Sequence, residues 1–135
     1  MVKVPASTLR VIEDIFFAAY LLMGTEERVM IYVDQSGQIL LRRPPGDRGR
    51  AHVDCDLELT IEAQGRQWDL AYDFHSHHVM GCGFSGVDDA NERIRGVTFG
   101  VFSWAGGLRR WKFRRWGGPA DGFEGLPIEE VVVDG

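Results

Sequence analysis

The sequence has few of the residues that mark several protein classes. Only two of its 135 residues are cysteines, Cys55 and Cys82, and neither belongs to a C-x-x-C pair. This scarcity argues against a disulfide framework and against a cysteine-rich zinc module. Because cysteines outside disulfides are typical of reducing compartments, we expect a cytoplasmic protein.

A membrane-spanning segment is also missing. The one apolar run that could be a targeting signal, residues 15–23, is shorter than the roughly 20 apolar residues that cross a bilayer. It follows the acidic pair Glu13 and Asp14, whereas a signal peptide needs a basic flank and a cleavage site of small residues. The run fits the second half of a buried helix, with Thr8 as its N-cap and Gly24 as its stop. We expect no membrane association.

Excess positive charge is the third absence. The chain has 15 lysines and arginines against 20 aspartates and glutamates, which gives a formal net charge of −5. General nucleic-acid binders usually gain affinity from surplus cations, so this balance argues against nucleic acid as a partner. The length and the ordinary share of apolar residues, 44%, suit one folded domain over residues 1–135.

The periods of apolar residues predict an α+β fold. A hairpin of two strands, residues 29–33 and 38–41, follows the helix. Apolar and polar residues then alternate from Val53 to Ile61 and, with opposite parity, from Trp68 to His77. Further strands are predicted at residues 96–104, 108–116 and 131–133. We expect a mixed, mostly antiparallel sheet flanked by the long N-terminal helix.

A tight turn predicts how two of these strands pair. Gly65 suits the first central position of a type II′ turn, with Arg66 as the second. The register that results pairs every apolar residue with an apolar one. The expected pairs are Ile61 with Leu70, Leu59 with Tyr72, and Leu57 with Phe74.

On the polar face, the same register brings acids beside histidines. Asp56 falls opposite His75, and Asp54 falls opposite His77. The two histidines are two residues apart on a strand, so they point to the same side. Two imidazoles beside carboxylates make a metal site plausible by geometry. Asp73 and Asp56 could orient the imidazoles by hydrogen bonds.

A second polar motif follows the histidines at a fixed distance. Ser85-x-x-Asp88 is typical of a capping box, which predicts a short helix that begins at Ser85 and has Asp88 in its first turn. Seven residues separate His77 from Ser85. Four residues at three fixed spacings seldom coincide by chance, so we interpret the two halves as one motif.

The combined motif resembles the signature of the JAMM/MPN zinc metallopeptidases, including their Prok-JAB-like members. That signature is H-x-H, seven residues, then S-x-x-D, and many members have serine between the histidines, as this chain has Ser76. The resemblance covers roughly residues 8–104 and implies a small JAMM/MPN-like domain.

The resemblance implies an enzyme that hydrolyses a peptide or isopeptide bond. His75, His77 and Asp88 would bind Zn²⁺, and a water would complete the coordination, as in catalytic rather than structural zinc sites. Ser85 would hydrogen-bond the oxyanion of the tetrahedral intermediate. The substrates of the family suggest a polypeptide partner, such as a ubiquitin-like or sulfur-carrier-like protein with a flexible tail.

The family also uses a glutamate, on the strand after the first helix, as general base. Glu27 aligns best with it, Glu26 is the alternative, and Glu58 is a more distant one. The chain departs from the family at two positions: Met30 stands where members carry glycine, and His78 stands where many carry proline. A hairpin also replaces the second helix of the larger members.

Two other functions stay open. Some MPN domains are non-catalytic scaffolds, and a related group of DNA-repair-associated proteins carries a similar motif. Residues 109–116 mix five cations with three aromatic side chains, which would suit a nucleic acid strand. The same segment also fits an edge strand, because Trp111 and Phe113 would share one face and the alternate cations the other.

Overall fold

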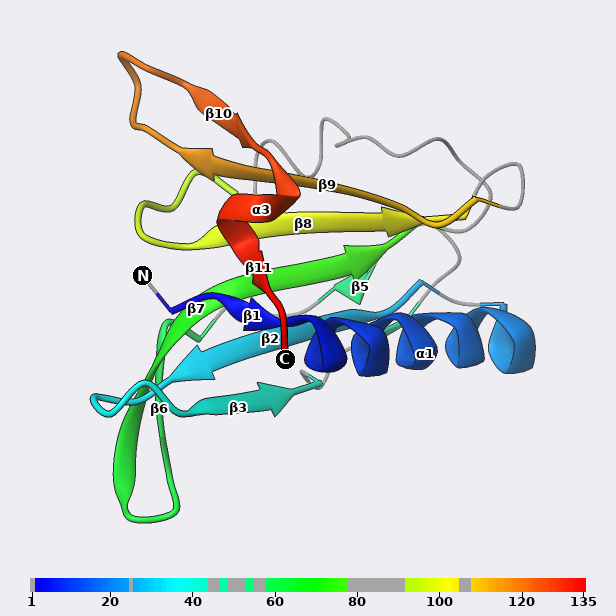
Figure 1. The fold of residues 1–135 in the computed structure, drawn as a ribbon, viewed down its shortest axis with the longest axis horizontal. Helices are drawn as coiled ribbons and strands as arrows, with labels where there is room; N and C mark the ends of the chain where they lie inside the picture. The colour runs from blue at the N-terminus through cyan, green and yellow to red at the C-terminus, as the bar shows by residue number, and fades with distance from the viewer. Residues whose placement is uncertain are drawn as a thin grey trace.

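A computed structural model gives the fold of the chain (Figure 1). It describes residues 2–24, 26–43, 47–48, 53–54, 58–77, 92–104 and 108–135. Within these ranges the fold is α+β, with a mixed sheet and two helices.

The long helix α1 spans Ala6–Met23. Leu9, Ile12 and Phe16 recur at helical spacing and are buried, as the sequence predicts. The helix ends at Gly24, which has a left-handed conformation (φ 63°) and donates its N–H to the carbonyl of Tyr20 at 3.0 Å. No helix within the described ranges has both the length and the apolar character needed to cross a membrane.

The start of α1 differs from the prediction. The N-cap is Pro5 rather than Thr8, and no side chain caps the helix. Proline holds φ near the helical value before the first turn, and it has no N–H that needs an acceptor. The N–H of Ser7 donates to the carbonyl of Gly135 at 2.9 Å, so the C-terminal end of the chain satisfies part of the first turn.

Within the described ranges, the main sheet contains seven strands. Their bounds are β2 Arg28–Val33, β3 Ile39–Arg42, β6 Thr60–Ala63, β7 Arg66–Ser76, β8 Thr98–Ser103, β9 Arg110–Trp116 and β10 Phe123–Leu126. Six of them lie in the order β10-β9-β8-β7-β2-β3, and β6 pairs with β7. The other elements of the described ranges are β1 Val4–Pro5, β4 Asp47–Arg48, β5 Val53–Asp54, α3 Ile128–Val131 and β11 Val132–Val133.

Strand β7 is central. Its second half lies between β2, which runs antiparallel to it, and β8, which runs parallel. The other pairs described in this sheet are antiparallel, so the sheet is mixed and mostly antiparallel, as predicted. A parallel pair needs a crossover connection, and here the crossover runs through residues 77–97.

The β6–β7 hairpin forms at the predicted place with a different register. Its two loop residues are Gln64 and Gly65, with φ of 55° and 75°, rather than Gly65 and Arg66. Positive φ at both positions is the type I′ geometry, whose twist matches the flanking strands. Ile61 therefore pairs with Trp68. The shift of two residues keeps each side chain on its predicted face.

Beyond the hairpin, β7 pairs with β2 on one side and with β8 on the other, so the apolar pairs expected with residues 53–61 are wrong. Tyr72 pairs with Ile31, and Phe74 pairs with Val29. Strand β2 is buried on both faces, which suits a central position. Residues 53–61 alternate apolar and polar side chains, which suits a strand with one face in water.

Because β7 has these strand partners, the two aspartates expected opposite the histidines are not found there. Asp54 lies in β5, which pairs with β4, so it is not opposite His77. His75 lies between Arg28 of β2 and Val101 of β8, so it is not paired with Asp56 as expected. Asp56 itself lies outside the described residues.

Residues 108–116 give rise to β9, which is an internal strand rather than an edge strand. It pairs with β8 over residues 110–115 and with β10 over residues 113–116. The C-terminal part of the chain supplies β10, because residues 117–122 reverse the chain direction after β9.

Each face of the sheet carries an apolar cluster. On the α1 side, the ring centroid of Phe16 lies 6.1 Å from that of Phe102 and 6.2 Å from that of Trp111. The opposite side has a smaller cluster that includes Tyr32 and Trp68. Strand β8 lies between these clusters and is buried along its whole length.

Gly100 of β8 lies against two buried rings, and an added methyl group has no space there. A Cβ would stand 2.6 Å from Cδ1 of Phe74 and 2.9 Å from Cδ1 of Phe113. We expect Gly100→Ala to lower the free energy of unfolding by about 1–3 kcal/mol. Gly125→Ala in β10 is the matched control, because no atom lies within 4 Å of its Cβ position. Urea unfolding measures both, and an equal loss in the two variants would contradict this packing.

Candidate metal centre

His75 and His77 stand at the carboxyl end of β7. His75 belongs to the strand, between Arg28 of β2 and Val101 of β8. His77 follows the last residue of the strand, and its N–H donates to the carbonyl of Phe102 at 2.8 Å. Neighbouring strands therefore hold the backbone that carries both imidazoles.

The two imidazoles approach each other through the same ring atom. Nε2 of His75 lies 3.2 Å from Nε2 of His77, the ring centroids are 5.0 Å apart, and the ring planes are inclined by 57°. Only 6% of His75 and 4% of His77 is exposed. The structure thus brings together the two histidines that strand parity places on one face.

This spacing fits a shared metal ion. Two nitrogens that bind one zinc at about 2.0–2.1 Å in tetrahedral geometry stand about 3.3–3.4 Å apart. The observed separation of the Nε2 atoms is 3.2 Å. A hydrogen bond from one Nε2–H to the other Nε2 has a similar length. Measurements of metal binding distinguish these two arrangements.

Ser76, between the histidines, connects β7 to the start of β2. Its side chain is buried, and its Oγ accepts a hydrogen bond from the N–H of Glu27 at 3.0 Å. The N–H of Ser76 donates to the carbonyl of Glu27, also at 3.0 Å. Strand alternation places Ser76 on the face opposite the imidazoles. This serine therefore fixes the backbone at Glu27 and leaves the other face to the histidines.

Both glutamates considered as general base are buried. Glu26 is 2% exposed and Glu27 is 0% exposed. One carboxylate oxygen of Glu27 accepts the N–H of Arg28 at 3.1 Å, and the other pairs with Arg43. When the β2–β7 register is extended two residues beyond Arg28, Glu26 comes to lie across from His77. Residues directly opposite in a ladder share a face, so this register position belongs to the imidazole face.

Asp73 lies on the imidazole face, two residues before His75. Its Oδ1 stands 3.1 Å from Nε of Arg28, and both side chains are largely buried. Because Arg28 is opposite His75, a buried ion pair borders the histidines. Substitution of either partner would destabilise the protein, because a single buried charge would remain. The expected hydrogen bond from Asp73 to an imidazole stays a prediction.

The second half of the motif, with Ser85 and Asp88, lies outside the described residues. In the part of the chain that the structure describes, no three histidine, cysteine, aspartate or glutamate side chains gather closely enough to hold a metal ion. A third protein ligand beside His75 and His77 would therefore come from outside these ranges. Its assignment to Asp88 stays a prediction, as does the role of Ser85.

Glu58 has a different environment from the other two glutamates. Its side chain is 50% exposed and lies 3.2 Å from Nη2 of Arg42. Its carbonyl accepts a hydrogen bond from the hydroxyl of Tyr32 at 2.6 Å. Burial raises the pKa of the Tyr32 hydroxyl, so this group remains a donor at neutral pH. These contacts favour a structural role for Glu58.

Comparisons with known proteins bear on the fold. No family model matches the chain, and no curated protein matches it. A solved structure of a protein from Salinibacter ruber is 16% identical, with a TM-score of 0.59 over 98% of this chain and 91% of that one. A protein from Desulfitobacterium hafniense is 11% identical, with a TM-score of 0.61 over 100% of this chain and 93% of that one. At these identities the similarity concerns the fold alone.

Two residues near the histidines were not predicted from the sequence. Arg28 becomes a neighbour of His75 only through the β2–β7 pairing. Ser103 of β8 is fully buried, and the β7–β8 register extended by one residue places it beside His77. Its Oγ has no hydrogen-bond partner among the described residues. A polar residue near the end of an apolar run is the signal that could have indicated Ser103.

Proposed function

We propose that this chain is a zinc-dependent metallopeptidase of the JAMM/MPN type that hydrolyses a peptide or isopeptide bond. One observation carries the proposal: the two motif histidines, His75 and His77, turn their Nε2 atoms toward each other at 3.2 Å in a nearly buried position. Two histidines and a carboxylate, with one open position, are a ligand set of catalytic zinc sites.

The place of the histidines in the sheet supports the same function. Among the described strand pairs of the main sheet, β7 and β8 are the parallel one. In open sheets with parallel strands, ligands bind outside the carboxyl ends of the strands. His75 and His77 stand at that end of β7, where the crossover to β8 begins. Ser85 and Asp88 belong to this crossover in sequence.

In the proposed reaction, His75, His77 and Asp88 hold the metal through two neutral imidazoles and one carboxylate. Zn²⁺ bound there would supply a Lewis acid that polarises the substrate carbonyl and makes water nucleophilic at neutral pH. Ser85 would donate a hydrogen bond to the carbonyl oxygen as negative charge develops on it. A glutamate would accept a proton from the attacking water and deliver it to the nitrogen of the leaving amine.

Glu27 and Glu26 are the two candidates for that glutamate. The motif alignment favours Glu27, whose backbone is hydrogen-bonded to Ser76 of the histidine strand. The register favours Glu26, because it lies across from His77 on the imidazole face. Both side chains are buried, which keeps either carboxylate away from bulk water.

The proposed substrate is a polypeptide, such as a ubiquitin-like or sulfur-carrier-like protein with a flexible tail. A flexible tail suits a nearly buried metal site, because an extended chain can enter where a folded domain is too wide. The proposal includes a cytoplasmic location, since the two cysteines suit a reducing compartment.

Metal content and hydrolysis of the wild-type chain test this function first. We expect about one zinc ion per chain when metal content is measured by inductively coupled plasma mass spectrometry. We expect cleavage of tail extensions fused to ubiquitin-like or sulfur-carrier proteins, loss of cleavage on chelation, and recovery with zinc. Magnesium is the control, because it prefers oxygen ligands and should not restore activity. Wild-type protein that stays free of zinc after reconstitution would rule out the enzyme.

A substrate trap would identify the natural partner. Zinc-loaded Glu27→Gln should retain a tail that it binds without cleaving, so it can be used to capture proteins from native lysate. The expected result is a captured protein whose tail the wild-type chain shortens. Capture of a protein that wild type leaves intact would instead favour a scaffold.

A further inference from the structure

Among the described residues, strand β9 has one side that is uncovered over part of its length. On one side it pairs with β8 over residues 110–115. On the other side β10 covers only residues 113–116, and the chain then leaves the sheet through Pro127 into α3. Among the described residues, no strand pairs with this second side at residues 110–112. An uncovered strand edge offers backbone N–H and C=O groups to another extended chain.

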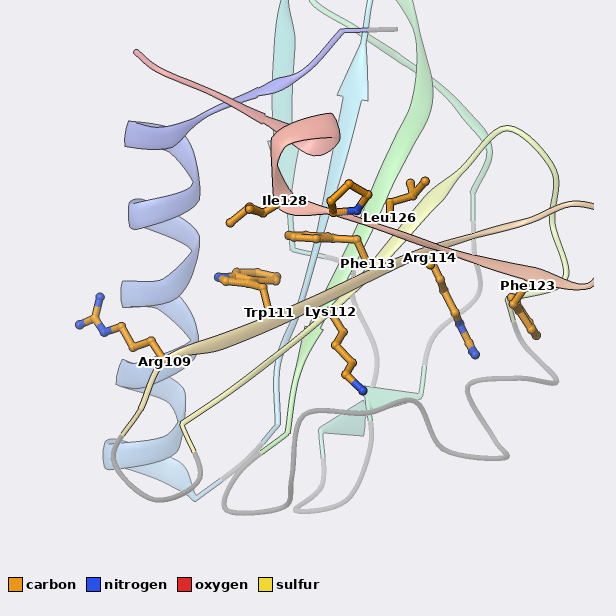
Figure 2. A pocket seen from close by; sticks show the side chains of 10 residues that line it. Arg109, Trp111, Lys112, Phe113, Arg114, Phe123, Leu126 and Ile128 are labelled. Atoms are coloured by element: carbon orange, nitrogen blue, oxygen red, sulfur yellow. The ribbon is translucent and has the colours of Figure 1, made fainter.

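A groove of about 690 Å³ follows this open edge. Its apolar lining comes from Trp111 and Phe113 of β9 and from Leu126, Pro127 and Ile128, where β10 ends. Figure 2 shows Trp111 and Phe113 on the same side of β9 as Leu126 and Ile128. The two β9 rings are stacked, with centroids 5.3 Å apart and planes inclined by 7°. The groove thus offers a firm apolar surface beside free backbone groups.

The opposite face of the same strand is cationic. Figure 2 shows Lys112 and Arg114 directed away from the side of Trp111. Arg114 is buried against Glu92, with Nε 3.3 Å from Oε1, whereas Lys112 and Arg110 are exposed. An added strand would therefore meet an apolar groove on one face and two exposed cations on the other.

We propose that an extended segment of a partner protein binds here as an additional strand beside residues 110–112. Its side chains alternate: apolar ones enter the groove at Trp111 and Ile128, and acidic ones face Arg110 and Lys112. In this mode the backbone hydrogen bonds give affinity, and the pockets for alternate side chains give specificity. The site lies outside the metal centre and does not depend on the proposed hydrolysis.

A nucleic acid strand fits the same surface less well. Stacking bases needs exposed aromatic faces next to the cations. Here Trp111 packs against Phe102 at 5.0 Å and against Phe74 at 5.1 Å between ring centroids, and its Nε1 donates to Glu13 at 2.7 Å. The aromatic side chains are thus engaged in the fold, on the face opposite Lys112.

The β3 edge of a second copy is also a poor match. Strand β3 ends the strand order on the side away from β10, and it has the sequence Ile-Leu-Leu-Arg over Ile39–Arg42. It has no acid to face Arg110 and Lys112, and Arg42 would add a like charge. Like charges placed opposite each other destabilise a strand pair.

A synthetic peptide tests the proposal directly. The probe is a fluorescent peptide of about eight residues that alternates valine and glutamate, with blocked ends, a length typical of a strand. We expect saturable binding by fluorescence anisotropy, with amide shifts at residues 110–112 in NMR spectra. Lys112→Glu should weaken binding about tenfold and should favour a valine–lysine peptide instead. The matched control, Arg10→Glu, reverses an exposed charge on α1 and should bind as wild type does.

Backbone methylation tests the strand pairing itself. Alternate N–H groups of an added strand point toward β9 and the others point away. We expect methylation of one alternate set of peptide amides to abolish binding and methylation of the other set to leave it. Equal tolerance of both sets, or unchanged affinity in Lys112→Glu, would overturn the proposal. So would displacement of the peptide by oligo(dT), or self-association of the chain that the peptide blocks. Binding should persist in His77→Ala, which separates this surface from the metal centre.

Discussion

His77→Ala is expected to abolish stoichiometric zinc binding. The substitution removes one of the two Nε2 atoms that lie 3.2 Å apart, and of the proposed ligands only one imidazole and Asp88 would remain. Loss of a residue that only supports a ligand weakens metal sites roughly 10- to 100-fold, so loss of a ligand should exceed about 100-fold. Competition with a chromophoric chelator measures the change in affinity.

His52→Ala is the matched control for this loss. His52 is the histidine most distant in sequence from the motif, so its replacement should leave zinc affinity unchanged. Circular dichroism checks that both variants are folded. Unchanged zinc affinity in folded His77→Ala would mean that the imidazoles share a hydrogen bond rather than a metal ion.

Glu27→Gln is expected to keep zinc and to lose hydrolysis. Glutamine has nearly the same shape as glutamate, and its carbonyl can still accept the N–H of Arg28, but it accepts no proton at neutral pH. Removing a general base should lower kcat by about 10²–10⁴-fold. Turnover of a tail-extended fusion protein and zinc content, measured on the same sample, separate chemistry from metal binding.

Two variants identify the cause of that loss. Glu27 forms an ion pair with Arg43, which Glu27→Gln also breaks. Arg43→Gln breaks this ion pair but keeps the Glu27 carboxylate, so it should retain activity if the carboxylate acts as the base. Glu62→Gln, at an exposed position of β6, controls for the loss of one negative charge. A large loss in Arg43→Gln would show that the ion pair, rather than proton transfer, is what activity requires.

Glu26→Gln distinguishes the two candidate bases. Full activity in Glu27→Gln together with loss in Glu26→Gln would assign the base to Glu26, in agreement with its register position across from His77. Activity in both variants would contradict the proposed mechanism, because no buried glutamate of this region would then be needed.

Elements that depend on near neighbours in the chain are predictable from the sequence. The spacing of apolar residues in α1 predicts which side of the helix is buried. Gly24 ends the helix in a left-handed conformation. The turn between β2 and β3 is equally local, because Oδ1 of Asp34 accepts the N–H groups of Ser36 and Gln38, each at 2.9 Å. The N-cap of α1 is the exception, since the carbonyl of Gly135 takes part in the first turn.

Strand partners are different, because each strand can pair with several others of similar pattern. The alternation of residues 53–61 and 68–77 predicts two strands with matching apolar faces, and that match suggests a long hairpin. The structure ends the hairpin early and gives the second half of β7 to β2 and β8. Strands that bury both faces gain more from the centre of a sheet than a strand with one polar face does.

For the candidate site, the sequence by itself determined that His75 and His77 share a face, because side chains alternate along a strand. It also determined the spacing to Ser85 and Asp88. Only the tertiary structure decided the surroundings of the histidine strand. They include the Arg28–Asp73 ion pair on the imidazole face and, on the other face, the hydrogen bond from the Glu27 N–H to Ser76, which joins residues 49 positions apart. These contacts depend on which strands flank β7. That choice is made by burial of whole strand faces, which no local pattern of residues specifies.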